Sequence, residues 1–360
     1  MSLELWTSGE LYDVLRDDRM DPIPSWWLDT FFTETHYSDD KEILFANLPM
    51  ADRRLAPFVL PTEQGKPIFR TKGEKVKSFL PPYIKPKDAV RAVDARNLRP
   101  SEVMPGGQRL TLQERFDARV IEVIDYHRRS IKIREAFMAS KAIIDGKISV
   151  KYDRDQGAAF PEVTIDFGRD PNLTVVLAGA NWNDPAYDII GDLNAWSALM
   201  YGAERGGLPV RLVLGFQAAA AFMKNEGIKE LLNTDYRGGE GTSFKRGLLN
   251  INDPMTHLGT LSGTNQSLEV WTFRDQVEDE DGNLIEILDP KDAVLIAPGT
   301  RGVRCYGAIY DAEAMQEPTP IDIFPKMWIS KDPGDVWLMH QSSPLPVNIE
   351  PNKTLKATVV

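Results

Sequence analysis

The chain has little of the chemistry that marks enzymes. Among its 360 residues it holds one cysteine, Cys305, and four histidines. A single cysteine excludes an internal disulfide and fits a reducing compartment. We expect Cys305 to be a buried small apolar residue, because no histidine lies near it in the sequence. The histidines share no H-x-x-x-H or H-E-x-x-H spacing, so the sequence predicts no zinc site; they are His36, His127, His257 and His340.

Motifs for nucleotides and for nucleophilic catalysis are also missing. Residues 238–245 are rich in glycine but lack the Gly-Lys pair of a phosphate-binding loop. No G-x-G-x-x-G fingerprint and no G-x-S-x-G elbow occurs. The acidic run at 278–283 lies between two strand-like segments, which favours a solvated hairpin tip over a calcium loop. We therefore predict no catalytic residue, no cofactor and no metal ligand, which argues against an enzyme.

No segment predicts secretion or a membrane span. The N-terminus has no basic stretch followed by an apolar run, and no window of about 18 apolar residues occurs. The chain has 53 acidic and 42 basic residues, a net charge of −11. This balance favours solubility and argues against a general affinity for nucleic acid or anionic membranes. We expect a protein that is cytosolic or is assembled in the cytosol.

The most informative stretch is residues 111–144, which contain neither glycine nor proline. Thr111 and Glu114 have the spacing of a capping box, and Gly146 supplies a stop signal. The pattern predicts one helix of about 50 Å, which suits a strut better than the wall of a pocket. Its apolar residues do not hold a strict heptad, so packing across a sheet is favoured over a two-stranded coiled coil.

Two segments near the N-terminus carry surface that they cannot bury alone. Residues 26–32 place five large apolar side chains within seven positions of a predicted arm. That cluster must dock on the rest of the fold or on a neighbouring chain. Residues 51–86 predict a long two-stranded hairpin with a strand at 55–60, a turn at 62–67 and a proline-rich exit. An isolated hairpin is at best marginally stable in water, so this one also needs a partner surface.

The remaining sequence predicts a mixture of helices and strands without the regular βαβ period of a parallel nucleotide-binding sheet. Hydrophobic periodicity predicts helices at 8–15, 189–201 and 216–224. It also predicts a β-hairpin at 148–167, a strand at 268–273 paired with 284–288, and buried strands at 210–214 and 293–296. Basic and acidic residues alternate along the long helix. This mixed charge indicates a solvated or subunit-facing surface rather than a nucleic-acid site.

The order of these parts resembles the major capsid proteins of tailed bacteriophages, which share the Hong Kong 97-type fold. Short segments spread from about residue 26 to 347 resemble the lambda-type major capsid protein E family. They are Phe31-Phe-Thr-Glu-Thr, Pro82-Tyr-Ile-Lys-Pro86, Arg301-Gly-Val-Arg-Cys-Tyr-Gly-Ala-Ile-Tyr-Asp311-Ala, Pro325-Lys-Met-Trp328, Asp332-Pro333 and Gln341-Ser-Ser-Pro344-Leu. Their shared order makes coincidence a poor explanation.

The resemblance implies an α+β fold in four parts. These are an N-terminal arm at 1–50, an extended β-hairpin loop at 51–86, a peripheral domain at 87–172 and 301–335 with its spine helix at 111–144, and an axial domain at 173–300 and 336–360. The implied function is that of a major capsid protein, whose copies form hexamers and pentamers of the icosahedral head around a double-stranded DNA genome.

The implied partners are further copies of the chain, a portal and a scaffolding protein, and whether a decoration protein also binds stays open. We expect the scaffolding protein to be separate, because the arm begins within about twenty residues of Met1. No membrane is expected, and packaged DNA would lie nearby without specific contacts. An acidic net charge would keep that DNA from adhering to the inner wall. The protein would be part of the virion and would assemble in the cytoplasm of the host bacterium.

We predict that subunit contacts use the apolar cluster, the basic hairpin and two arginines of the long helix. These residues are Trp26, Trp27, Phe31, Phe32, Arg53, Arg54, Lys66, Arg70, Lys72, Lys75, Lys77, Arg128 and Arg129. Two other functions stay open at this point. One is a cytosolic α/β enzyme of unrecognised type with a substrate domain at 171–300, and the other is a different phage assembly protein, of a tail tube or a decoration layer.

Overall fold

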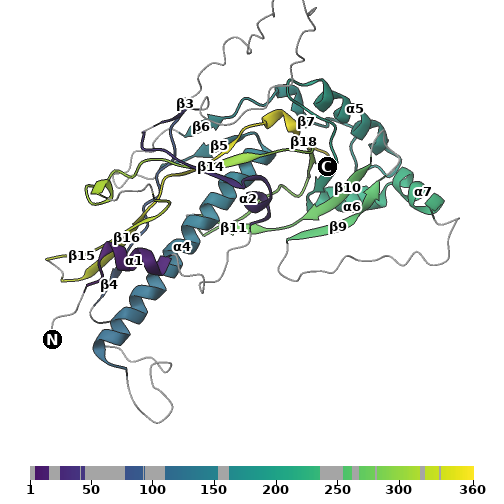
Figure 1. The fold of residues 1–360 in the computed structure, drawn as a ribbon. Coiled ribbons are helices and arrows are strands. Elements are labelled where there is room, and N and C mark those ends of the chain that lie inside the picture. Colours follow the sequence, from purple (N-terminus) through teal and green to yellow (C-terminus); the bar gives the residue numbers. More distant parts are fainter. Residues whose placement is uncertain are drawn as a thin grey trace, which may run out of the picture.

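The long helix expected from the sequence is present as α4 (Leu112–Ile144) in the computed structural model (Figure 1). Thr111 is its N-cap, and both halves of the capping box form. The Glu114 amide donates to the Thr111 hydroxyl at 3.3 Å, and the Thr111 amide donates to Glu114 Oε2 at 2.6 Å. Gly146 follows the last turn with φ of +68°, a left-handed conformation that ends the helix at little steric cost.

The structure describes most of the chain but not the expected extended loop. The described residues are 5–15, 25–40, 42–44, 78–91, 93, 110–152, 162–235, 254–261, 267–279, 282–316, 321–331 and 334–360. The predicted strand at 55–60 and turn at 62–67 therefore lie outside the described residues. Within them, no helix combines the length and apolar character that a membrane span requires.

A six-stranded mixed sheet forms the part of the molecule that contains the C-terminus (Figure 1). In spatial order its strands are β7 (Thr174–Val176), β18 (Thr354–Thr358), β13 (Asp292–Ile296), β8 (Arg211–Leu214), β10 (Leu268–Phe273) and β9 (Met255–Leu261). The pairs β7–β18 and β8–β10 are parallel, and the other neighbours are antiparallel.

Alternate side chains of this sheet enter two different cores. Leu212 and Leu214 pack in a cluster with residues of α5 (Ile189–Gly202), α6 (Phe216–Lys224) and α7 (Glu226–Asp235). Val213, between them, packs in the cluster that contains the C-terminal half of α4. Successive strand residues point to opposite faces, so the middle of the sheet is covered on both sides. That explains the unbroken apolar runs that predicted buried strands here.

Smaller sheets and hairpins complete the fold. One three-stranded sheet has the order β1 (Glu34–Tyr37), β14 (Gly302–Tyr306), β17 (Pro344–Asn348), and another has the order β15 (Phe324–Ile329), β16 (Val336–Gln341), β4 (Lys87–Val90). Two-stranded pairs join β2 (Ile43–Leu44) to β3 (Ser78–Phe79), β5 (Lys147–Val150) to β6 (Val163–Asp166), and β11 (Gln276–Glu278) to β12 (Leu284–Glu286). Single 3-10 turns lie at Pro171–Leu173, Ala314–Gln316 and Pro351–Lys353.

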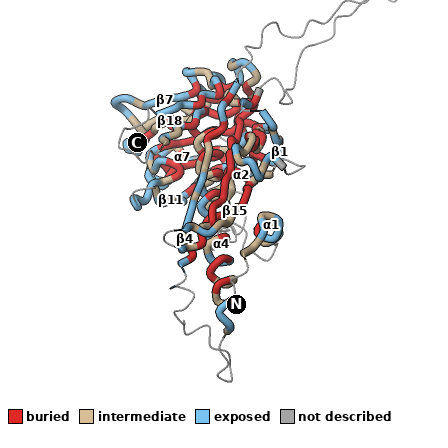
Figure 2. The backbone as a smooth tube through the Cα atoms, turned by 90° about the vertical axis from the view of Figure 1, so that its left-hand side faces the viewer, coloured by how far each residue is buried: buried red, intermediate tan, exposed pale blue. Residues whose placement is uncertain are grey.

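Helix α4 enters two cores along its length. Its N-terminal half buries Phe116, Val120 and Ile124 against α1 (Ser8–Leu15) and the inner face of the β15–β16–β4 sheet. Its C-terminal half packs on β17 and on α2 (Trp26–Phe31). Figure 2 shows buried backbone along α4 from the body of the molecule toward its lower end. Packing across strands, rather than in a coiled coil, is therefore confirmed.

Two expectations about long-range pairing differ from the structure. The strand at 284–288 was expected to pair with 268–273, but β12 pairs with β11. Both edges of β10 are already occupied by β8 and β9, so it has no free edge for β12. The expected division also separated residues 301–335 from 336–360, whereas β15 and β16 are paired along their whole length.

The N-cap of α4 can be tested by substitution. Thr111→Ala removes the hydroxyl that accepts from Glu114, so we expect the free energy of unfolding of the isolated subunit to fall by about 1 kcal/mol. Thr111→Ser keeps the acceptor and should retain most of the wild-type value. Urea unfolding followed by circular dichroism measures both variants. Equal destabilisation by serine and alanine would show that the cap does not contribute through this hydroxyl.

Candidate assembly surfaces

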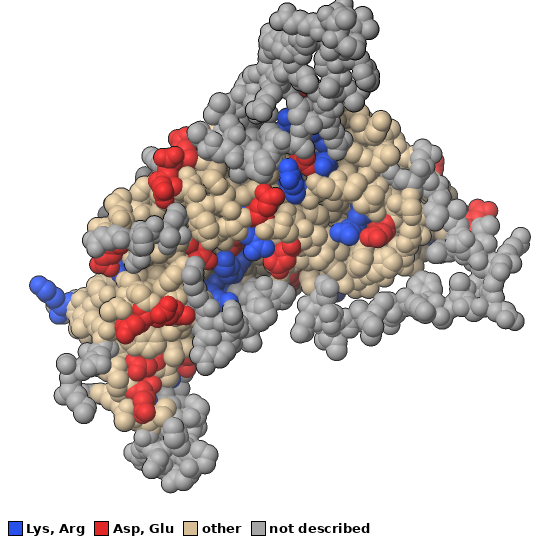
Figure 3. Space-filling model, in the orientation of Figure 1, with Lys and Arg blue, Asp and Glu red and all other residues tan. Residues whose placement is uncertain are grey.

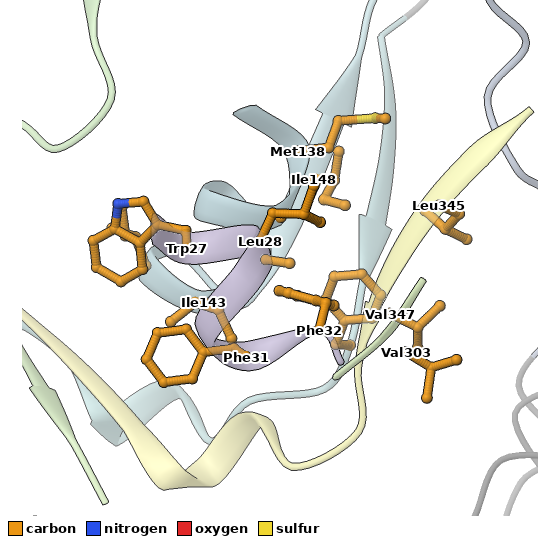
Figure 4. Close-up of a cluster of buried hydrophobic side chains, with 14 of the residues drawn as sticks. Trp27, Leu28, Phe31, Phe32, Met138, Ile143, Ile148, Val303, Leu345 and Val347 are labelled. Atoms are coloured by element: carbon orange, nitrogen blue, oxygen red, sulfur yellow. The ribbon is translucent and has the colours of Figure 1, made fainter. Parts of the chain in front are cut away.

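The apolar cluster of the arm lies inside the chain's own core. In Figure 4, Phe32 points toward Val303 of β14 and Val347 of β17, whereas the rings of Trp27 and Phe31 lie on the other side of the arm helix. All three belong to one buried cluster with residues of α4, β5, β14 and β17. Trp27 is 2% exposed, Phe31 5% and Phe32 0%. Trp27 also packs edge-on against Phe273 of the six-stranded sheet, with 5.4 Å between ring centroids. The arm helix thus fills the junction between α4 and two sheets.

Strand β14 is shaped to receive this helix. A side-chain carbon at Gly302 would overlap the ring of Phe32, so only glycine lets the strand approach this closely. Arg304 then fixes the helix end: its Nε donates to the Phe32 carbonyl at 2.6 Å, and its Nη2 donates to the Asp29 carboxylate at 2.9 Å. Charge-assisted bonds of this kind are stronger than neutral ones. No local sequence pattern indicated these roles, although both residues fall in the 301–312 segment that carried the family resemblance.

The placement of the arm corrects an expectation about subunit contacts. Of the two possibilities left open by the sequence, the cluster docks on the rest of its own fold. Trp27, Phe31 and Phe32 therefore offer almost no surface to a neighbouring subunit. Trp26 differs, because it is only half-buried at the edge of the cluster. Its ring packs edge-on to Trp27 at 4.7 Å and lies 5.8 Å from the Arg211 guanidinium.

The basic residues expected at interfaces fall into two groups. Those of the predicted hairpin lie outside the described residues; they are Arg53, Arg54, Lys66, Arg70, Lys72, Lys75 and Lys77. The two arginines of the long helix lie on α4. Arg128 is half-buried, and Arg129 is exposed with its Nε 2.8 Å from the Asp125 carboxylate. The pair follows the i, i+4 spacing that the mixed charge pattern indicated.

The outward surface of α4 combines apolar and acidic side chains. Three large apolar residues are exposed there: Tyr126 by 65%, Ile121 by 42% and Ile133 by 41%. Figure 3 shows acidic side chains gathered over α1 and the neighbouring part of α4. The acidic residues of these two segments are Glu10, Asp13, Glu114, Asp117, Glu122 and Asp125. We call this region the acidic face of α1 and α4.

Buried ionic groups link α4 to strands far away in the sequence. Tyr306 donates to Glu135 Oε1 at 2.8 Å, and Lys132 Nζ lies 3.1 Å from Glu135 Oε2. Burial, followed by the Glu135 charge, raises the pKa of Tyr306, so the phenol keeps its proton and stays a donor. Tyr306 and Glu135 are 171 positions apart in the sequence. Sequence reasoning missed them because it detects only local spacing.

A second, partly buried link joins the end of α4 to the six-stranded sheet. Lys356 Nζ lies 2.8 Å from Asp145 and 2.9 Å from Asp292. Burial alone would lower the pKa of Lys356, but the two carboxylates outweigh it and raise the pKa above its usual value. The ammonium therefore stays charged. The Asp292 side chain is 3% exposed, so loss of Lys356 would leave a buried charge uncompensated. The link therefore fixes the C-terminal end of α4 on β18 and β13.

The described residues provide few groups suited to catalysis. They contain no cluster of three or more histidine, cysteine or acidic residues arranged to hold a metal ion. Cys305 is fully buried in β14, as expected, and burial raises the pKa of its thiol to about 12. A thiol with that pKa is a poor nucleophile at neutral pH. The polar contacts of this region join elements that are far apart in the sequence.

Substitution of the two arm tryptophans should show which one is a core residue and which one is partly exposed. Trp27→Ala should lower the free energy of unfolding of the isolated subunit by about 3–5 kcal/mol, because it empties a buried site. Trp26→Ala, the matched control, should cost about 1 kcal/mol because its ring is partly in solvent. Urea unfolding of the two purified variants measures the difference. Equal losses would contradict the docking of the arm described here.

The comparisons with known proteins agree with this architecture. A family model described as phage major capsid protein E matches residues 16–359. The major capsid proteins of Escherichia phage N15 and Escherichia phage lambda are 26% and 25% identical to the chain, each over 98% of both sequences. A crystal structure described as that of a prophage capsid protein from Escherichia coli CFT073 matches with a TM-score of 0.68 at 19% identity, over 99% of both chains.

These matches confirm the expected fold. The architecture is α+β and of the Hong Kong 97 type, with α4 as the long helix that crosses it. The match of the family model extends over nearly the whole sequence, and the relatives align from end to end rather than over a shared module. The chain therefore belongs to the phage major capsid protein E family.

Proposed function

We propose that this protein is the principal subunit of the icosahedral head of a tailed bacteriophage, forming hexamers and pentamers around the double-stranded DNA genome. The observation that carries the proposal is the end-to-end match to major capsid proteins of lambda-like phages. The described residues favour this function over an enzyme, because their buried polar groups join structural elements and Cys305 is buried with a raised pKa.

The division between buried and exposed surface supports assembly. Closed shells are built from repeated contacts between different patches of identical subunits. The arm helix is used inside the subunit, so other surfaces must make those contacts. Half-exposed Trp26 and the exposed apolar residues of α4, Tyr126 and Ile133 among them, are available for this role. Tryptophan, tyrosine and arginine are the side chains that most often dominate binding energy at interfaces.

Charge supports a role for the hairpin segment between subunits. Residues 63–77 contain Lys66, Arg70, Lys72, Lys75 and Lys77 against two acidic residues, in a chain whose net charge is −11. The acidic face of α1 and α4 carries the opposite sign. Complementary potentials steer association and fix its register. We therefore infer that the basic segment of one subunit contacts an acidic surface of the next.

The wider assembly follows from the same proposal. We expect a scaffolding protein and a portal as partners, with the presence of a decoration protein left open, and assembly in the cytoplasm of the host bacterium before the shell becomes part of the virion. The acidic net charge supports only non-specific proximity to packaged DNA, because phosphate binding relies on lysine and arginine contacts. These partners stay predictions.

Particle size tests the proposed function directly. The full-length protein, expressed with the scaffolding protein of its phage, should form closed shells in negative-stain images and elute as capsomers or megadalton particles. Rings or open tubes would indicate a tail protein instead. A species that stays at the monomer mass of 40.5 kDa under every assembly condition would contradict the proposal.

Charge reversal tests the basic segment. Replacing Lys66, Lys72 and Lys75 by Glu should leave the isolated subunit folded but block shell formation, because attraction to a neighbour becomes repulsion. The matched control replaces the same three lysines by Arg, which keeps the charge and should assemble. Deletion of residues 63–77 should act like the charge reversal. Circular dichroism checks folding, and sedimentation measures the shell fraction. Normal shells from the Glu variant would exclude a contact of this kind.

A further inference from the structure

Two histidines 213 positions apart meet inside the subunit. His127 on α4 and His340 on β16 are 1% and 0% exposed, and their Nδ1 atoms lie 2.8 Å apart. The other ring nitrogen of His127, Nε2, lies 3.1 Å from Oδ2 of Asp88 on β4. The Asp88 side chain is 52% exposed, so it connects the buried pair to solvent. The three side chains form a continuous polar chain from the surface to the core.

The positions of the protons follow from this geometry. An ionised Asp88 accepts a hydrogen bond, so the Nε2 of His127 carries a hydrogen and donates it. In neutral His127 the Nδ1 is then an acceptor, and the Nδ1–H of His340 donates to it. Nε2 of His340 then carries no hydrogen and has a lone pair that could accept a hydrogen bond. This atom is buried and has no hydrogen-bond partner among the described residues.

The pair has room for one additional proton but not for two. A first proton could make His127 cationic beside Asp88 if His340 moved its hydrogen to the unpartnered Nε2. A second proton would place hydrogens on both Nδ1 atoms, which are only 2.8 Å apart, and would put two positive rings next to each other. No arrangement of two cations keeps the Nδ1–Nδ1 hydrogen bond. Protonation of both rings must therefore separate α4 from β16.

The surroundings of the two histidines also disfavour their protonation. Burial, opposed by Asp88, lowers the pKa of His127, and burial together with the His127 charge lowers the pKa of His340 to about 3. From α4, the Tyr126 ring also faces His127, with 6.2 Å between centroids. From β15, the residue opposite His340 is the uncharged Pro325. Asp88 on β4 is thus the facing group that favours the cation.

We propose that Asp88, His127 and His340 form an acid-sensitive latch that holds the middle of α4 on strands β4 and β16 and opens when the histidines take up protons. On α4 the latch lies within the N-terminal core, between the buried residues Ile124 and Ile131. Its opening would loosen the β15–β16–β4 sheet from the helix while the core around α2 and β17 stays packed. The inference concerns the subunit itself and does not depend on the partner proteins.

The sign of the pH effect follows from linkage. A histidine whose pKa is lower in the folded than in the unfolded chain binds fewer protons when folded, so its contribution to stability is present above the unfolded value of 6.5 and is lost as pH falls toward the folded value. With a folded pKa of about 3, His340 alone should raise the unfolding equilibrium constant about 30-fold between pH 8 and pH 5.

The test compares the pH dependence of the full-length wild type with a variant that lacks both histidines. Urea unfolding from pH 8 to pH 5 should show a rise in the unfolding constant at least about 30-fold larger in wild type than in His127→Leu/His340→Leu. His36→Gln, the matched control, replaces a histidine on β1 outside the latch and should keep the wild-type dependence. The same pH dependence in wild type and the double variant would overturn the proposal.

A second measurement needs no variant. Nitrogen-15 spectra of histidine-labelled wild type should show one ring with an unprotonated, non-hydrogen-bonded nitrogen at pH 7, as expected for Nε2 of His340. Amide exchange, corrected for its intrinsic pH dependence, should accelerate in β4 and β16 at pH 5 before it does in β17. Two cationic rings at pH 6 with unchanged exchange in β16 would show that protonation does not open the latch.

Discussion

The packing of α4 on strand β17 and on the arm helix α2 is the constraint on which the rest of the structure depends. A 33-residue helix rich in charged residues gains most of its stability from tertiary contacts rather than from intrinsic propensity. Here one helix belongs to two cores: α1 and the three-stranded β15–β16–β4 sheet cover its first half, and the arm, β14 and β17 cover its second half. Lys356 then ties the end of the helix, at Asp145, to the six-stranded sheet. These contacts fix the position of each of the named elements relative to α4.

Local signals in the sequence predicted part of the local structure, but not helix α7 or strands β14 to β18. The capping box and the glycine stop placed both ends of α4, and alternation of apolar residues placed the β5–β6 hairpin. Pairing between distant strands was not predictable in the same way. The sequence pattern of a strand indicates which of its faces is apolar but not which strand edge is available for pairing. For this reason β12 was assigned to β10 instead of β11. The pairing of residues 336–341 with β15 was not predicted for the same reason, since it is visible only in three dimensions.

The same limit applies to the functional surfaces. Five large apolar side chains within seven positions showed that the arm had to be buried, but only the fold shows that its own core receives Trp27 and Phe32. The contacts that hold the subunit together cross long stretches of sequence: Glu135 with Tyr306, Asp145 with Lys356, and His127 with His340. None has a characteristic spacing. Resemblance over the whole chain identified the family because it depends on the order of many weak segments rather than on one motif.

The central claim is that the arm is internal to the folded subunit and that assembly uses the surfaces that the fold leaves exposed. Hydroxyl-radical footprinting of the free subunit and of the assembled shell tests both halves together. Trp27 and Phe32, at most 2% exposed, should resist oxidation in both states, whereas Tyr126, 65% exposed, should be oxidised in the free subunit and protected in the shell. Strong oxidation of Trp27 in the free, folded subunit, or equal oxidation of Tyr126 in both states, would contradict it.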